Sequence, residues 1–142
     1  MNRSWLTLCA LSAGPMASMA AAAAGMPCNQ LSQLRLADTR ITRAEGVAPS
    51  GSWPVPDSLF SRFPGTPHAA VTVPFCRVSA LIDKEINVEV WLPLEWNQRY
   101  QGVGNGGFTG SLNYPAMASA VNAHFATAST DTGHATEQFE CR

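Results

Sequence analysis

A glycine-rich run between two strand-like segments restricts the fold of this chain more than any other feature. Residues 99–103 read as a short strand, and five glycines fall within residues 102–110. Pro115 then marks a place where a helix can begin, and residues 125–129 read as another strand. Between them, side chains recur at helical spacing, at Met117, Ala120, Val121 and His124. A strand, a helix and a strand in succession form a βαβ unit, so the two strands are expected to be parallel.

A hairpin is expected before this unit. Residues 75–82 and 85–92 are two strand patterns joined by Asp83-Lys84. In the second pattern one set of alternate positions is apolar and the other set is mixed, which predicts a strand with one apolar and one mixed face. The apolar positions are Val88, Val90 and Leu92, and the mixed positions are Asn87, Glu89 and Trp91.

The segments ahead of the hairpin give weaker signals. Residues 28–36 indicate a short helix at best, and residues 39–47 are a candidate strand. Residues 48–74 are rich in proline, glycine and serine, which predicts a long irregular arm. The predicted fold class is therefore α/β, with hairpin strands, a glycine loop and a βαβ unit.

The length, net charge and hydropathy of the chain exclude several classes of protein. With 142 residues the chain suits one domain with a sizeable core. A net charge of −1 provides no basic surface for nucleic acid, and 46% hydrophobic residues argue against disorder. The long apolar stretch near the start is interrupted at Gly14-Pro15, so no membrane-spanning segment is expected. Residues 1–24 instead read as a secretory signal peptide, with Arg3 before an apolar run and small residues around the cleavage region.

Export would place the cysteines in an oxidising compartment, where they are expected to pair. Cys9 would leave with the signal peptide, so Cys28, Cys76 and Cys141 would remain. Cys28 and Cys76 are the natural pair. Their bond would close the loop that contains the irregular arm and would stabilise the folded state by about 2–4 kcal/mol. Cys141 is then unmatched, with either a partner outside the 142 residues or a free buried thiol.

The glycine run has three competing interpretations, of which the first is a dinucleotide-binding fingerprint. Gly102, Gly104 and Gly107 match G-x-G-x-x-G. Asp131 lies at a strand end, near the place of a ribose-binding acid. Against this interpretation, the helix should start at the third glycine, and residues 108–114 intervene. A Rossmann-like oxidoreductase segment would also need NAD, and NAD is rarely available to a secreted protein.

The second interpretation is an oxyanion hole. In α/β-hydrolases one donor is a backbone N–H in the loop after the third strand, and that loop must bring N–H groups within about 3 Å of the oxyanion. Glycines suit this approach because no side chain blocks it. The order of hairpin, short strand, glycine loop, helix and strand fits the beginning of that fold. The third interpretation is a tightly turning loop without chemistry, as in a small non-catalytic secreted binding domain.

Other polar and aromatic residues are weaker candidates. Ser111 and Ser129 lack the flanking glycines of a G-x-S-x-G nucleophile elbow. His124 is expected to pack or cap on the apolar side of the helix, and His134 to form a structural hydrogen bond at a strand end. Asp131 with His134 makes only two metal ligands, so no metal site is predicted. Three tryptophans are expected to pack in or beside the core rather than to line an aromatic-ligand site. They are Trp53, Trp91 and Trp96.

Five short stretches carry a further signal when they are taken together. They are Cys28 with Leu31, Pro74-Phe75-Cys76-Arg77-Val78, Glu89-Val90-Trp91-Leu92-Pro93, Trp96-Asn97 through Gly104-Asn105-Gly106-Gly107 to Gly110, and Ala126-Thr127-Ala128-Ser129-Thr130-Asp131-Thr132-Gly133-His134. In this order and spacing they resemble the tannase and feruloyl esterase family. The resemblance covers most of residues 28–134, and its last two stretches are the most specific.

The resemblance implies a secreted or periplasmic serine esterase with an α/β-hydrolase fold and an inserted lid domain, acting on phenolic-acid esters such as galloyl and feruloyl esters. In that family the nucleophile, the acid and the base lie further along the chain. Residues 25–142 would therefore be the N-terminal part of the domain, truncated before the nucleophile and inactive alone. The backbone of Gly106 and Gly107 would supply an oxyanion-hole donor. The family also supports a Cys28–Cys76 disulfide.

The same resemblance sets the expected partners. A small aromatic ester would be the substrate of the intact enzyme, with neither nucleic acid nor a membrane as a partner. No cofactor or metal is expected for this segment, since calcium would belong to the lid domain, which the 142 residues lack. Residues 135–142 depart from the family pattern, which leaves their register and the partner of Cys141 open.

Overall fold

The computed structural model describes residues 25–62, 64–65, 69–105 and 110–133. Several sequence predictions concern residues outside these ranges. They are the signal peptide at residues 1–24, the proposed donors Gly106 and Gly107, His134 and Cys141. Within the described ranges, no helix has the length and apolarity needed to cross a membrane.

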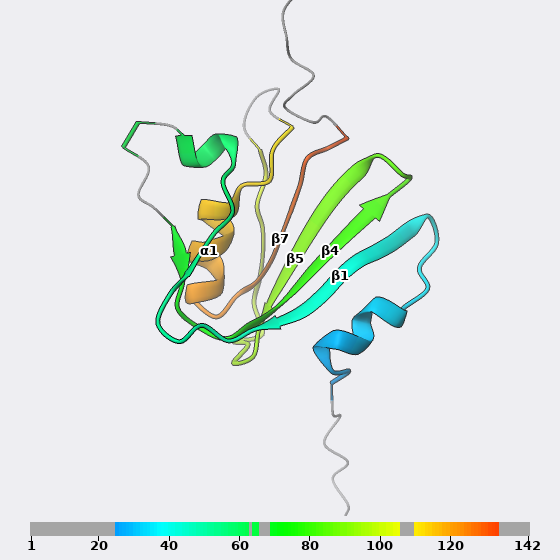
Figure 1. Ribbon diagram of the computed structural model, residues 1–142, viewed down its shortest axis with the longest axis horizontal. Helices are drawn as coiled ribbons and strands as arrows, with labels where there is room; N and C mark the ends of the chain where they lie inside the picture. The colour runs from blue at the N-terminus through cyan, green and yellow to red at the C-terminus, as the bar shows by residue number, and fades with distance from the viewer. Residues whose placement is uncertain (1–24, 63, 66–68, 106–109, 134–142) are drawn as a thin grey trace, which may run out of the picture.

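A five-stranded mixed sheet forms the centre of the molecule (Figure 1). Its strands are β1 (Thr39–Val47), β4 (Phe75–Ile82), β5 (Ile86–Pro93), β6 (Tyr100–Gly102) and β7 (Ala126–Thr130). Their spatial order is β1-β4-β5-β7-β6, with antiparallel pairs from β1 to β7 and a parallel pair between β7 and β6. The predicted hairpin is β4–β5, and β1 has the bounds expected from the sequence.

The predicted βαβ unit lies at the β6 edge of the sheet. α1 (Tyr114–Asn122) connects β6 to β7, and these strands are parallel as expected. The helix begins one residue before Pro115, with Asn113 as its N-cap. His124 lies just beyond the helix, with a left-handed φ of 62°, and not on the apolar side of the helix as predicted. Its N–H donates to the Val121 carbonyl, so the expected capping role is correct.

α1 packs on the mixed face of β5 rather than on its apolar face. On the mixed face, Trp91 is 0% exposed and Glu89 is 5% exposed. On the other face, Val88, Val90 and Leu92 are only half-buried. The hydrophobic core lies between the helix and the sheet. Its buried members are Val71, Phe75, Trp91, Tyr114, Met117, Ala118 and Val121. A carboxylate therefore lies inside the packed layer and needs polar partners there.

The arm before the hairpin is less irregular than its composition predicts. β2 (Trp53–Pro54) and β3 (Ala70–Val71) pair antiparallel, and η2 (Leu59–Arg62) is a short 3-10 helix. The small sheet packs on the core, since Val71 is fully buried and the ring centroid of Trp53 lies 5.5 Å from that of Trp91. The prediction of irregular structure is wrong for these short elements.

The predicted disulfide between Cys28 and Cys76 is formed, with 5.7 Å between the Cα atoms. It joins η1 (Cys28–Gln33), a 3-10 helix, to β4. Because side chains alternate along a strand, Cys76 points to the face opposite that of Arg77 and α1. The bond therefore fastens the N-terminal segment to the sheet on the side away from α1 (Figure 1).

Candidate functional site

The glycine loop starts at the carboxyl end of β6, beside the carboxyl end of the parallel strand β7. The Val103 N–H extends the ladder by donating to the Ala128 carbonyl at 2.8 Å. Asp131 follows the last residue of β7 at the same edge. In open α/β sheets, ligands bind at this edge, where parallel strands end and loops begin. Residues 103–105 therefore lie where the fold class places its functional sites.

Asn113 holds the two ends of the glycine loop together. Its side-chain Nδ2 donates to the carbonyl of Gly104 at 3.4 Å, across the loop. Its Oδ1 accepts from the Ala116 N–H at 3.2 Å, which caps α1. Its own N–H donates to Ser129 Oγ at 3.1 Å, on β7. One residue thus fixes the loop to the sheet edge and to the helix. Ser129, 3% exposed, has a structural role here.

Asp131 fastens the ends of β5 and β7 to each other. Its carboxylate accepts from the Asn87 N–H at 2.9 Å, from Asn87 Nδ2 at 2.6 Å and from the Gly133 N–H at 3.0 Å. The residue is 6% exposed. A ribose-binding acid must present its oxygens to the ligand, and these oxygens face the protein. The orientation of the Asp131 carboxylate disfavours the dinucleotide interpretation. The start of the helix at Tyr114, rather than at the third glycine, disfavours it as well.

Glu89 is the centre of a buried polar network that joins β4, β5 and α1. Its carboxylate accepts from Arg77 Nε at 3.0 Å and from Arg77 Nη2, from Trp91 Nε1 at 2.7 Å, from the Tyr114 hydroxyl at 3.2 Å and from the Ser79 hydroxyl at 3.3 Å. Arg77 is 8% exposed and Tyr114 is also 8% exposed. Such a bidentate, fully partnered pair meets the requirement for charges inside a protein.

Burial and charge determine the protonation of this network. Burial, and next the negative charge of Glu89, raise the pKa of Tyr114 to about 12. Burial by itself lowers the pKa of Arg77, but the hydrogen bond and the charge of Glu89 outweigh it, and the net pKa is raised. Near neutral pH, Arg77 is therefore a cation and Tyr114 a neutral donor. No role for Arg77, Glu89 or Tyr114 was predicted from the sequence.

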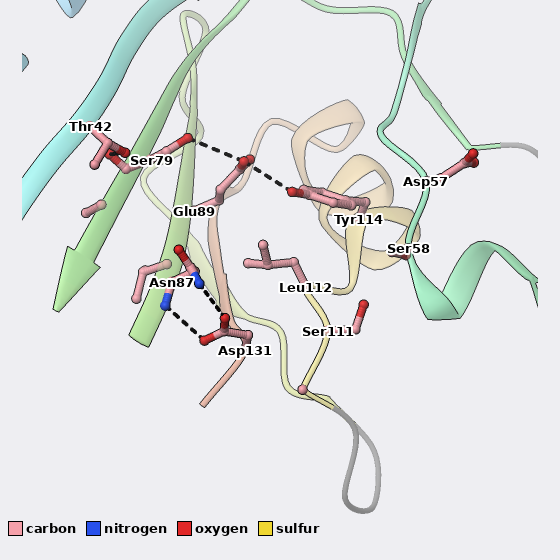
Figure 2. A pocket seen from close by; sticks show the side chains of 13 residues that line it. Thr42, Asp57, Ser58, Ser79, Asn87, Glu89, Ser111, Leu112, Tyr114 and Asp131 are labelled. Atoms are coloured by element: carbon pink, nitrogen blue, oxygen red, sulfur yellow. Dashed lines mark hydrogen bonds between the residues drawn. The ribbon is translucent and has the colours of Figure 1, made fainter. Parts of the chain in front are cut away.

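A cavity of about 390 Å³ lies beside the glycine loop, between the mixed face of the hairpin, the start of α1 and the arm (Figure 2). Tyr114 and Glu89 form its inner wall, Ser111 belongs to the returning end of the loop, and Asp57 comes from the arm. Ser111 Oγ accepts from the Leu59 N–H at 3.3 Å, so it ties the loop to η2. The cavity thus lies beside the sheet edge at which α/β folds bind their ligands.

The comparisons with known proteins agree on one family. Residues 70–140, half of the 142, match the family model described as tannase and feruloyl esterase. The chain belongs to this family. It is 37% identical over 123 residues to an uncharacterized esterase of Xanthomonas campestris, with 83% of this chain and 20% of that protein covered. It is 32% identical over 108 residues to a probable feruloyl esterase B-2 of Aspergillus flavus, with 68% and 20% covered.

Two solved structures of Aspergillus oryzae proteins resemble this member of the tannase and feruloyl esterase family. An esterase aligns with a TM-score of 0.62 and 26% identity, over 76% of this chain and 22% of the other. Feruloyl esterase B aligns with a TM-score of 0.60 and 25% identity, over 76% and 21%. The chain thus spans about a fifth of the length of the relatives that it matches. These matches give no support to an oxidoreductase or to a small binding domain.

The expected packing roles are confirmed for Trp91 and Trp53 in this member of the family, and the prediction is wrong for the exposed Trp96. Trp91 is fully buried, and its ring centroid lies 5.1 Å from that of Phe75. Trp53 lies at the edge of the core, and Arg77 stacks over its ring at 5.4 Å. Trp96 is 54% exposed, and its Nε1 donates to the Arg99 carbonyl at 2.7 Å. The assignment of oxyanion donors to Gly106 and Gly107 stays a prediction, because these residues lie outside the described ranges.

Proposed function

We propose that this chain is the N-terminal part of a secreted serine carboxylic-ester hydrolase with an α/β-hydrolase fold, acting on phenolic-acid esters. Membership of the tannase and feruloyl esterase family supports the reaction class. The names of the relatives, which include a probable feruloyl esterase B-2, support the phenolic acyl group. The coverage of about a fifth of each relative supports a longer enzyme, with nucleophile, acid and base beyond Arg142.

The observation that carries the proposal is the position of the glycine loop. It leaves the carboxyl end of β6 next to β7, and Asn113 holds its two ends. In α/β-hydrolases a backbone N–H of the loop at this point stabilises the oxyanion. The amide of Gly106 or Gly107 would be that donor in this chain. Such a donor acts on charge that develops only in the transition state, and its removal typically costs about 10²–10³ in kcat.

The reaction would proceed through an acyl-enzyme. A serine supplied by the polypeptide beyond the 142 residues attacks the ester carbonyl, and a histidine takes its proton. The carbonyl oxygen becomes an oxyanion at the glycine loop. When the intermediate collapses, the bond to the leaving oxygen breaks, and the histidine gives its proton to that oxygen, which releases the alcohol. Water then hydrolyses the acyl-enzyme by the same steps and releases the phenolic acid. The residues of this chain hold the oxyanion, and they supply no general base.

Secretion is part of the proposal. The Cys28–Cys76 disulfide supports an oxidising compartment, since disulfides persist in exported proteins and are rare in the cytosol. A signal peptide at residues 1–24 would direct the export. Fractionation of the native host should find the mature protein outside the cytoplasm with a new N-terminus near residue 25.

The deciding experiment compares two proteins on methyl ferulate and methyl gallate. The first is the product of the complete reading frame, and the second is the 142-residue chain by itself. We expect the first to hydrolyse at least one of the esters and to lose activity after treatment with a serine-directed phosphonate. We expect no hydrolysis by the second. Hydrolysis by the 142 residues alone, or none by the complete product, would refute the proposal.

A further inference from the structure

The turn that follows β7 has a backbone conformation that one of its residues disfavours. Thr132 has a φ of 56° and Gly133 has a φ of 76°, so two successive residues are left-handed. Glycine adopts this conformation freely, whereas a β-branched residue such as threonine rarely does. A strained residue persists only where its surroundings determine the conformation, and such residues cluster at functional sites. The turn after β7 is therefore a candidate for a functional role.

The side chain of Asp131 determines where β7 ends. The Asp131 N–H donates to the Asn87 carbonyl at 3.1 Å, as in an antiparallel strand pair. The returning bond from the Asn87 N–H goes to the side-chain Oδ1 of Asp131, at 2.9 Å, which takes the place of the Asp131 carbonyl (Figure 2). The same Oδ1 accepts from the Gly133 N–H at 3.0 Å, and the Asp131 carbonyl accepts from the Thr132 hydroxyl at 2.7 Å. The backbone therefore leaves the sheet after Asp131 while the carboxylate continues the ladder to β5.

The end of β7 carries the residue that anchors the glycine loop. β7 pairs with β6 as far as Ala128, whose carbonyl also accepts from the Val103 N–H. Ser129, whose Oγ accepts from the Asn113 N–H, is the next residue, and of the described strands only β5 pairs with it. The last residues of an element open locally unless their bonds hold them. The position of Ser129 therefore depends on the bonds that Asp131 makes to β5 two residues further on.

We propose that Asp131 is a positioning residue for the ester hydrolysis, because its carboxylate fixes the end of β7 and thereby the Ser129–Asn113 anchor of the glycine loop. The proposal rests on the proposed function. Asp131 and Gly110 both line the cavity beside the loop, so the turn after β7 and the returning end of the loop border the same space. A loop amide stabilises charge that is present only in the transition state, so a displaced loop should lower kcat without changing KM.

Two replacements of Asp131 separate the geometry of its side chain from its charge. Asp131→Ala removes the bonds that the carboxylate accepts from Asn87 and Gly133. Asp131→Asn keeps Oδ1 as the acceptor for both backbone N–H groups, and the Asn87 amide can turn over so that its oxygen accepts from the new amide nitrogen. The matched control is Asn122→Ala, which also removes three side-chain hydrogen bonds, at the other end of α1.

The measured quantities are kcat and KM for methyl ferulate with the product of the complete reading frame, expressed per folded molecule. Removal of an oxyanion donor typically costs about 10²–10³ in kcat, so the displaced loop of Asp131→Ala should lower kcat by at least about 10-fold. KM should stay at the wild-type value. Asp131→Asn and Asn122→Ala should keep the wild-type kcat. A wild-type kcat in Asp131→Ala, or an equal loss in Asp131→Asn or Asn122→Ala, would overturn the proposal.

A double-mutant cycle tests the route through Asn113. Asn113→Asp removes the donor to the Gly104 carbonyl. If Asp131 acts through the same anchor, Asp131→Ala/Asn113→Asp should lose about as much kcat as the larger single variant, whereas independent losses would multiply to about 100-fold. Multiplied losses would refute the route. If Asp131→Ala does not fold, Asn87→Ala, which removes only the bond to Oδ2, takes its place. It should lower kcat by a smaller factor, and an unchanged kcat would count against the proposal.

Amide hydrogen exchange separates this proposal from the proposed function, because it needs no turnover. The Asn113 N–H donates to Ser129 Oγ, so it reports directly on the anchor. In the same protein this amide should exchange at least about 10-fold faster in Asp131→Ala and at the wild-type rate in Asp131→Asn. Faster exchange in a protein whose wild type hydrolyses no ester would refute the proposed function and support the structural role of Asp131. Hydrolysis by the wild type with unchanged exchange in Asp131→Ala would refute the role of Asp131 alone.

Discussion

Asn113 offers the sharpest test of how the fold positions the glycine loop. Replacement by alanine removes two side-chain hydrogen bonds, one to the Gly104 carbonyl and one from the Ala116 N–H. Loss of an N-cap costs about 1 kcal/mol, and loss of a neutral hydrogen bond costs about 1 kcal/mol more. We therefore expect Asn113→Ala to lower the free energy of unfolding by about 2 kcal/mol.

Asn113→Asp separates the two contacts. A carboxylate still caps α1 and interacts favourably with the positive end of the helix dipole. It cannot donate to the Gly104 carbonyl and repels it instead. The variant should therefore lose about 1 kcal/mol or less in stability. Its loop should nevertheless be displaced, and kcat should fall by about 10-fold, because a loop amide acts on charge that is present only in the transition state.

The assay combines urea unfolding with steady-state hydrolysis of methyl ferulate by the product of the complete reading frame. Asn122→Asp is the matched control, since Asn122 makes equivalent contacts at the other end of α1. Its Nδ2 donates to the Ala70 carbonyl at 2.8 Å, and its Oδ1 accepts from the Thr72 N–H at 2.9 Å. This control should lose stability and keep the wild-type kcat. If Asn113→Asp also kept the wild-type kcat, or changed KM alone, the loop-positioning role would be refuted.

Three further predictions concern stability. Glu89→Gln leaves the buried Arg77 without its counter-charge, so urea unfolding should show a free energy of unfolding that is lower by about 3–5 kcal/mol. The double variant Arg77→Met/Glu89→Leu should lose less stability. An equal loss in the two variants would contradict the counter-charge argument. Tyr114 has a folded-state pKa of about 12 against 10.0 for the ordinary group, so its contribution to stability is complete below pH 10 and is lost as pH rises from 10 to 12. The urea midpoint of Tyr114→Phe should therefore fall less over this interval than that of the wild type. Parallel plots of urea midpoint against pH for the two proteins would refute the assignment. Replacement of both Cys28 and Cys76 by alanine, or reduction of the disulfide, should lower the free energy of unfolding by about 2–4 kcal/mol. The measurement is urea unfolding with and without reductant. Reductant should have no effect on the double variant.

The order of elements could be predicted from the sequence because it rests on local periodicity. The strands of the hairpin and the helix after the glycine loop have residue patterns that repeat within a few positions. The parallel orientation of β6 and β7 follows from the helix that connects them. β2 and β3 could not be found in this way. Each has two residues, and their pairing brings Trp53 opposite Val71, which only the packing of the arm on the core establishes.

The position of the glycine loop could be predicted from the sequence, and the contacts that support the loop could not. Glycines between a strand and a helix locate the loop, and parallel strands place it at their carboxyl edge. The anchors come from residues distant in sequence, such as Ser129 for the Asn113 N–H and Leu59 for the Ser111 hydroxyl. A sequence signal for the polar network did exist, because Arg77 and Glu89 are oppositely charged residues on the same face of a predicted hairpin.

The buried carboxylate of Glu89 links the fold to the glycine loop. Alternation along β5 gives two faces, and the more apolar one would gain more from burial by α1. The helix nevertheless packs on the mixed face, where the Tyr114 hydroxyl completes the hydrogen bonds of Glu89. Successive residues of an α-helix are about 100° apart around its axis. A shift of α1 by one residue would therefore turn Tyr114 away from Glu89 and move Asn113 away from Ser129. Because the buried Glu89 carboxylate needs the Tyr114 hydroxyl, it also fixes the register of the loop.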